Sequence, residues 1–190
     1  MTARYRPANP GIIEQTAILR DVSLPEVHAA EGEQATASLT PFPWLVVLTQ
    51  DCDLELDRLA RAGLPAAEGK PPVSKDKVLR SILLCPAFLQ DHVTAGRYVA
   101  GAKEWKGTEL NTLVNNRHER FHVLPADSSL VADSLAVDFK LILAAHPAYL
   151  EGWIISHPSS AVCVLESPYK ERLMQRFVNY FGRIAEPDGE

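Results

Sequence analysis

The sequence has few cysteines, and they form no recognisable pattern. Its 190 residues include three, Cys52, Cys85 and Cys163. Their odd number and wide spacing match neither a C-x-x-C pair nor a Cys/His zinc pattern. Nothing in this spacing indicates a disulfide framework, which favours a reducing compartment. A chain of this length buries enough apolar surface to fold without a metal or a disulfide, so we expect no cofactor and no metal.

Long hydrophobic runs are also missing. No segment approaches the roughly 18 apolar residues that a membrane span requires. The first ten residues contain Arg4 and Arg6 but no apolar segment, unlike a secretory signal peptide. We therefore expect a cytoplasmic protein that does not associate with membranes.

An excess of basic residues is lacking too. The chain has 24 acidic residues against 19 Lys and Arg, for a net charge of −5. This balance argues against a broad phosphate-binding surface but is compatible with a small basic patch. The Walker loop and the G-x-G-x-x-G, H-E-x-x-H and G-x-S-x-G motifs are absent from the sequence, which removes support for the common nucleotide-dependent enzymes and hydrolases.

What the sequence does contain is a series of short apolar segments of strand length. Predicted strands cover residues 12–22, 44–48, 78–85, 117–124, 135–145, 152–156 and 161–165. Short helices are predicted at 53–62 and 105–116. Residues 23–43, punctuated by prolines, are predicted to be a loop, and residues 63–76 a mobile loop.

The clearest predicted element is a C-terminal amphipathic helix at residues 167–182, packed on the sheet. Ser167 is its expected N-cap and Gly182 its expected left-handed C-cap. We expect one α+β, mostly β domain over residues 1–190. Short strands at this spacing predict a small SH3-like barrel or a bent antiparallel sheet.

The first candidate site is the polar cluster Thr49–Asp53, which follows the buried strand at Trp44–Leu48. Asp51 and Asp53 could hold a hard cation. Cys52 could act as a nucleophile if a histidine or a helix N-terminus activated it. The cluster could also recognise a partner, mainly through Gln50 and Asp51. We favour a structural interpretation, in which Cys52 is a small buried hydrophobe and an aspartate caps the next helix.

The second candidate site is the run Asn115–His122. On a strand, His118, Arg120 and His122 would share one face, whereas on a helix His118 and His122 would do so. With Arg117, such a row could contact phosphate or perform acid–base chemistry. We favour the alternative that it is a solvated, charged strand edge.

A third group of charges lies on the predicted C-terminal helix. Lys170, Arg172 and Arg176, followed by Arg183, could meet nucleic acid or an acidic partner. We favour the interpretation that they form the solvated side of an amphipathic helix.

The order of elements from residue 12 to residue 49 resembles the PemK/MazF-type toxins. It consists of an N-terminal strand, a long loop, and a strand that is preceded by proline and ends in Thr49. The resemblance implies an SH3-like barrel and RNA cleavage. The segment Gln50–Asp53 lies outside the toxin pattern, and no catalytic residue of the family maps onto this chain.

A second resemblance rests on Thr-Gln-x-Cys-Asp, on Arg-x-Phe-His-x-Leu-Pro, and on the Ser-Pro-Tyr, Arg-Phe and Tyr-Phe-x-Arg motifs near the C-terminus. These resemble a group of bacterial proteins that we associate with mobile or defence gene neighbourhoods. We therefore expect a non-catalytic interaction or regulatory module of a defence or toxin-type system, with a protein partner.

The alternative function is an RNA-binding or RNA-cleaving barrel. Its catalytic candidates would be Cys52, Asp53, His118 and His122, and its binding candidates Gln50, Asp51, Arg117 and Arg120. This alternative requires the two candidate sites to meet in one concave, positively charged pocket.

Overall fold

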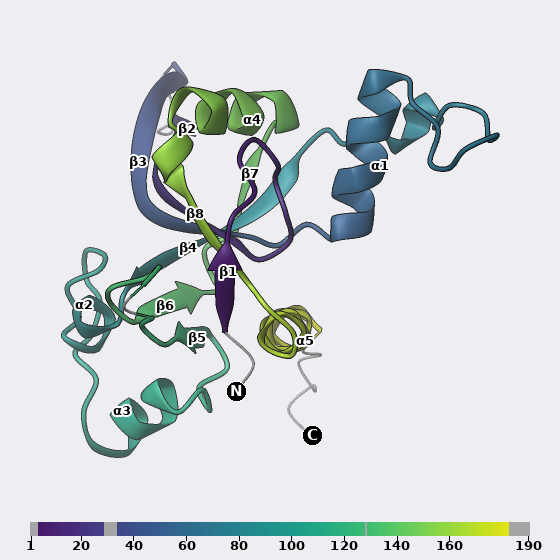
Figure 1. Cartoon of the computed structure of the whole chain (residues 1–190). Helices are drawn as coiled ribbons and strands as arrows, with labels where there is room; N and C mark the ends of the chain where they lie inside the picture. The colour runs from purple at the N-terminus through teal and green to yellow at the C-terminus, as the bar shows by residue number, and fades with distance from the viewer. Residues whose placement is uncertain (1–3, 29–33, 128, 183–190) are drawn as a thin grey trace, which may run out of the picture.

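The computed structural model describes residues 4–28, 34–127 and 129–182 (Figure 1). The strands of these residues are β1 Tyr5–Pro7, β2 Ala17–His28, β3 Thr36–Val47, β4 Ile82–Leu89, β5 Phe121–Leu124, β6 Leu135–Asp138, β7 Leu143–Ala145 and β8 Ala161–Leu165. The helices are α1 Asp51–Ala62, α2 Gln90–Thr94, α3 Gly107–Val114, α4 Pro147–Ser156 and α5 Tyr169–Phe181, with 3-10 turns η1 Lys75–Lys77 and η2 Pro158–Ser160. The predicted α+β class is confirmed.

All strand pairs in the described residues are antiparallel. Their order is β1-β8-β2-β3-β4-β6-β5, and β7 pairs with β4 beside this path. The two end strands, β1 and β5, do not pair with each other. The described strands therefore form an open antiparallel sheet, and the closed SH3-like barrel is not what the chain forms.

The strands β3 and β4 form the centre of the sheet. Trp44–Val47 pair with Ala87–Leu84. Alternate side chains point to opposite faces, so Val46 and Cys85 enter one buried cluster while Leu45 and Leu84 enter another. Burial on both faces explains why the sequence at Trp44–Leu48 is continuously apolar rather than alternating.

Helices cover the sheet from several sides (Figure 1). Leu150 and Ile154 of α4 belong to the cluster around Leu45, and Leu173 of α5 belongs to the cluster around Val46. A third cluster joins β5 and β6 to α2 and α3 around Phe121. The helix α5 starts at Tyr169 with Pro168 rather than Ser167 at the N-cap, and Gly182 has φ −77°, so the expected left-handed cap is not formed.

The loop predicted at 23–43 is wrong for residues 23–28 and 36–43, which extend β2 and β3, while residues 29–33 of that prediction lie outside the described residues. The register continues out to the pair His28 and Thr36. Beyond Ala17–Leu19, β2 has no second neighbour among the described strands, and β3 has a second neighbour only at Trp44–Val47. Prolines are tolerated in strands with free edges, which is why three of them misled the prediction.

Pro86 does not end the strand predicted at 78–85; it lies inside β4. Along the edge away from β3, β4 pairs with β7 through Leu84 and with β6 from Ala87 onward. Pro86 lies between these two pairings, so its missing N–H removes no ladder hydrogen bond on that side. The predicted strand at 135–145 is similarly divided, because Leu141 N donates to Asp138 O in a turn between β6 and β7.

Three other boundaries also differ. The predicted strand at 152–156 is part of α4, which begins with Pro147 and has the His146 side chain accepting a hydrogen bond from Ala148 N. The strand predicted at 12–22 starts at Ala17, and the strand predicted at 117–124 starts at Phe121. A short apolar run such as Trp153–Ile155 fits a helix or a strand equally well, and capping decides between them here.

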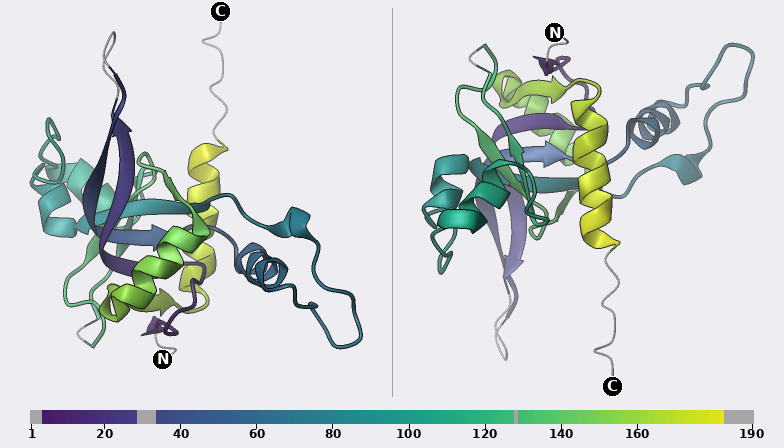
Figure 2. Two further views of the ribbon diagram at one scale, coloured as in Figure 1. Left: turned by 90° about the horizontal axis from the view of Figure 1, so that it is seen from above. Right: turned by 90° about the horizontal axis from the view of Figure 1, so that it is seen from below.

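Residues 51–77, which we call the arm, stand out from the rest of the molecule (Figure 2). The helix α1 ends at Ala62, as the sequence predicts, and Gly63 caps it in a left-handed conformation with φ 66°. An isolated bridge joins Pro65 to Pro72, and Val73 N donates to Leu64 O at 2.9 Å. The mobility expected of residues 63–76 stays a prediction. Within the described residues, none of the helices combines the length and the apolar character that crossing a bilayer would take.

We expect Leu84→Ala to lower the free energy of unfolding by about 2 to 5 kcal/mol, because it opens a cavity in the central strand. Leu83→Ala is the matched control, since its side chain lies on the adjacent position of β4 with 40% exposure against 0% for Leu84. That change should cost less than about 1 kcal/mol. Urea unfolding of both variants measures the difference, and equal losses would contradict the assigned register.

Candidate functional site

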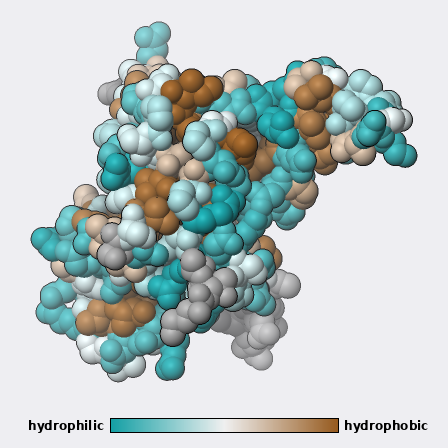
Figure 3. Space-filling view, viewed as in Figure 1, coloured by the Kyte–Doolittle hydropathy of each residue, from teal (hydrophilic) through white to brown (hydrophobic). Residues whose placement is uncertain are grey.

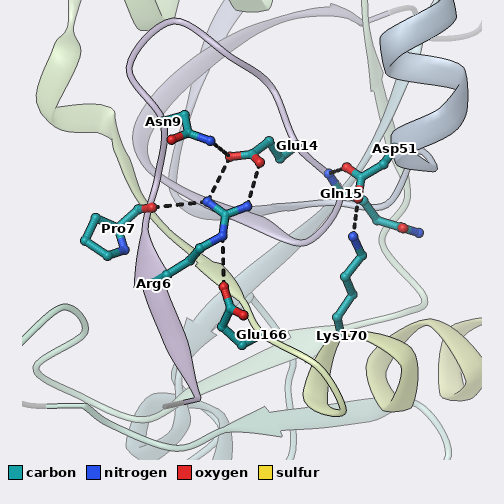
Figure 4. Close-up of polar contacts among 8 residues, drawn as sticks. All are labelled: Arg6, Pro7, Asn9, Glu14, Gln15, Asp51, Glu166 and Lys170. Carbon is teal, nitrogen blue, oxygen red and sulfur yellow. Dashed lines mark hydrogen bonds and ion pairs between the residues drawn. The ribbon is translucent and has the colours of Figure 1, made fainter. Parts of the chain in front are cut away.

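The polar cluster after β3 is a junction between distant parts of the chain (Figure 4). Gln50 is the extended residue before α1, and its side chain makes no capping hydrogen bond. Asp51 accepts a hydrogen bond from Gln15 N at 2.7 Å and forms an ion pair with Lys170 of α5. Asp51 therefore joins the segment before β2 to the start of α5, rather than capping its own helix.

A second set of charges lies beside this junction (Figure 4). Arg6 donates to both carboxylate oxygens of Glu14 at 2.6 and 3.1 Å, and its Nε contacts Glu166 at 2.9 Å. The hydrogen bond with Glu14 raises the pKa of Arg6. These contacts hold the loop between β1 and β2 against the end of β8.

Cys52 is exposed, which contradicts the expectation that it is a buried hydrophobe. Its Sγ lies 3.6 Å from Gln50 Oε1. Asp53 is also exposed, on the first turn of α1. Within residues 4–28, 34–127 and 129–182, no group of three or more His, Cys, Asp or Glu side chains could hold a metal ion. Cys52 is the second residue of α1, and its Sγ contacts Gln50 rather than a histidine.

A cleft of about 230 Å³ lies between α1 and the loop before β2. Its lining consists of Gly11, Ile12, Ile13, Glu14, Asp51, Leu54, Glu55, Asp57, Arg58, Ile82 and Glu151. Carboxylates outnumber cations in this lining by five to one. The sequence analysis includes Asp51 in its first candidate site. Glu14 and Glu151 also line the cleft, but no local sequence pattern indicates that they lie near Asp51.

The arm is attached beside this cleft by a buried charge cluster. The Asp57 side chain is 2% exposed and accepts hydrogen bonds from Arg61 Nε and from Leu79 N, both at 2.9 Å. Arg61 also donates to Glu151 of α4. The hydrogen bond with Glu151 is the largest effect that raises the pKa of Arg61, against the effect of burial. The cluster thus ties α1 to α4 and to the chain leaving the arm.

The second candidate site does not form a row, because residues 117–120 turn before β5 begins. The His118 ring packs edge-on against Trp105 at 4.8 Å. Arg120 forms a double hydrogen bond with the buried Asp138 at 2.7 and 2.6 Å. The prediction of a solvated strand edge is wrong as well, because β5 is buried along its whole length.

His122 is buried in β5. Its side chain lines a pocket with Arg172 of α5, which shares no residue with the cleft at Asp51. Burial, followed by the charges of Arg176 and Arg172, lowers the pKa of His122 to about 3. The two candidate sites therefore lie in different cavities, and Arg117 lines a further pocket beside Glu119 and Arg176.

Arg176 is a residue whose function the sequence interpretation missed. It donates to the backbone carbonyls of Asn116, His118 and Phe121, which surround the turn before β5. Helical periodicity places it on the polar side of α5, but only the fold brings these carbonyls to it. Neither Arg176 nor Lys170 is a purely solvated charge, and Arg183 lies outside the described residues.

No protein-family model, curated protein sequence or solved structure matches this chain. The function therefore has to be argued from the geometry.

We expect Asp57→Ala to lower the free energy of unfolding by about 1 to 3 kcal/mol, because it leaves Leu79 N without its acceptor and leaves Arg61 with Glu151 as its remaining carboxylate. Cleavage of residues 63–76 by a protease should accelerate with it. Asp53→Ala, an exposed position on the same helix, should change stability by less than about 0.5 kcal/mol. An arm equally resistant to protease in both variants would rule out this attachment.

Acidification should destabilise the protein through His122. Its pKa is lowered from 6.5 to about 3 in the folded state, so between these values the unfolded chain binds a proton that the folded chain does not. The free energy of unfolding therefore falls by about 1.4 kcal/mol for each pH unit as the pH is lowered from 6.5 toward 3. His122→Phe should remove this component. Urea unfolding at a series of pH values measures it, and parallel curves for the two proteins would refute the assignment.

Proposed function

We propose that this protein is a non-catalytic interaction module, and that the cleft between α1 and residues 11–14 binds a basic, partly apolar segment of a partner protein. The observation that carries this proposal is the lining of the cleft, in which aliphatic side chains lie among carboxylates. A concave surface of this composition is the usual form of a specific binding site.

The apolar part of the cleft comes from three elements. Leu54 of α1 and Ile82 of β4 line it as nearly buried residues, while Ile12 keeps 47% of its surface exposed. An aliphatic side chain from a partner would remove Ile12 from water, which favours binding by roughly 25 cal/mol for each Å² of apolar surface buried. Figure 3 shows that the arm beside the cleft stands out on a largely hydrophilic face.

The charged part of the cleft selects a basic partner. Asp51, Asp57, Glu14 and Glu151 are each paired with a cation of the chain itself. Glu55 is exposed and forms no ion pair with any residue in the described part of the chain. A Lys or Arg of a partner would pair with this carboxylate, and the excess of carboxylates over cations around the cleft discriminates against acidic partners.

The arrangement of the other candidate residues favours binding over catalysis. Cys52 is exposed outside the cleft lining, and His118 and His122 have different surroundings. The RNA-cleaving alternative needs an acid and a base in one pocket, so it loses support. The resemblance to bacterial defence-associated proteins suggests that the partner belongs to such a system, and this remains a prediction.

Charge reversal at Glu55 tests the proposal. The probe is a fluorescent peptide of alternating lysine and leucine, titrated into the full chain and followed by anisotropy. The native protein should bind it saturably, and added salt should weaken the complex. Glu55→Lys should reduce affinity by about ten-fold or more, because an attraction is replaced by a repulsion.

Glu68→Lys is the matched control, since Glu68 is exposed on the arm but does not line the cleft. It changes the net charge equally and should leave the affinity within about two-fold of the native value. Ile12→Ala should weaken the complex without altering its salt dependence. The proposal fails if Glu55→Lys and Glu68→Lys weaken binding equally, or if binding does not saturate.

A further inference from the structure

A second, smaller pocket of about 90 Å³ lies between β5 and the first turns of α5. It is lined by Arg4, Asn116, His122, Val123, Leu124, Pro125, Leu165, Tyr169 and Arg172. This volume admits a small anion or a few water molecules. The pocket shares no lining residue with the acidic cleft beside α1.

The charge of this pocket is opposite to that of the whole chain. Two arginines and no carboxylate line it, although acidic residues outnumber Lys and Arg in the sequence. Arg172 is exposed on α5, and its side chain has no hydrogen-bond or ion-pair partner among the described residues. Arg4 lies over the Tyr169 ring at 5.0 Å, and its Nε has no partner in the described part of the chain. The charge of Arg4 contributes to lowering the pKa of Asp127, but less than the hydrogen bonds from Ser129 do.

His122 adds a buried polar group that is not satisfied. The residue is 5% exposed, and its Nδ1 finds no hydrogen-bond partner in the ranges that the structure describes. Leaving such a nitrogen without a partner is unfavourable, so it points to a ligand or a bound water. Because its pKa is about 3, the imidazole is neutral at pH 7 and can donate one N–H without adding charge.

The walls of the pocket are fixed by bonds that do not depend on a ligand. The Asn116 side chain exchanges two hydrogen bonds with the backbone of Val123, next to His122. Arg176 of α5 donates to three carbonyls around the same turn, and these hydrogen bonds hold the turn against α5. A site that is held in place before binding loses little conformational entropy when the ligand enters.

We propose that this pocket binds a phosphate group, held by Arg4 and Arg172 and accepting a hydrogen bond from His122. Guanidinium forks bind tetrahedral oxyanions through paired N–H groups, which suits two arginines around a small cavity better than a single lysine would. The group could be free inorganic phosphate or the end of a phosphomonoester. This site is independent of the interaction proposed for the cleft, so either can fail alone.

Calorimetric titration of the full chain at neutral pH tests the proposal. The probes are inorganic phosphate and glycerol 3-phosphate, with acetate at matched ionic strength as the control anion. Saturable binding of one or both phosphates supports the site, and their relative affinities identify whether the free ion or the ester is preferred. No saturable phosphate binding, or acetate binding of equal strength, overturns it.

Variants show whether the binding occurs at this pocket. Arg172→Gln changes an exposed side chain and should reduce phosphate affinity by about ten-fold or more, because a charge-assisted contact is lost. Arg80→Gln, an exposed arginine outside the pocket, should leave it within about two-fold. Equal losses in the two variants would refute the assignment.

His122→Phe separates binding from folding. It replaces a buried nitrogen by carbon of similar shape, so the protein at pH 7 should unfold at the same urea concentration or a higher one. Phosphate affinity should nevertheless fall, because the neutral N–H donor is removed. A variant that is equally stable and binds phosphate as tightly as the native protein would exclude His122 from the site.

Discussion

The structure depends on one constraint, which is that the pairing of β3 with β4 is buried on both faces. Val46 and Cys85 face the cluster under α5, and Leu45 and Leu84 face the cluster under α4. A one-residue shift in register would exchange these two sets of side chains, so the register is strongly fixed. Because β3 leads directly into Thr49 and the start of α1, this pairing also determines where the arm and its cleft begin.

The arm is attached both by apolar packing of Leu54 and by a cluster of charges. Asp57 is buried between Arg61 and Leu79 N, and Arg61 continues to Glu151 of α4. Buried charges are tolerated only when every group finds a partner, so this cluster specifies a geometry more than it adds stability. The lining of the adjacent cleft contains five carboxylates and one cation, Arg58. Glu55 is the exposed carboxylate among them that forms no ion pair in the described residues.

The sequence predicts the parts of the fold that depend on local chemistry. The apolar run at Trp44–Leu48, the helix ended by Gly63 and the amphipathic C-terminal helix all lie where their patterns indicate. The paired ends of β2 and β3, at residues 23–28 and 36–43, could not be predicted from a sequence rich in proline, since the cost of a proline in a strand depends on which strand edges stay free. The site residues were harder still to predict, because Arg120 pairs with Asp138 and Asp51 pairs with Lys170, and the fold brings these distant residues together.

The helix α5 shows why a polar helix face cannot be interpreted from its spacing alone. In the sequence, Lys170, Arg172 and Arg176 are equivalent cations of the predicted amphipathic helix. In the structure Lys170 binds Asp51 and Arg176 binds three carbonyls, so both charges are used within the chain. The Arg172 side chain has no hydrogen-bond or ion-pair partner in the described residues. It lines a pocket together with His122, which is buried and has an unsatisfied Nδ1. An arginine without a partner beside an unsatisfied polar group is better explained by a bound ligand than by solvent. Solvation alone would not explain why carboxylates are absent from the pocket lining or why hydrogen bonds fix the pocket walls.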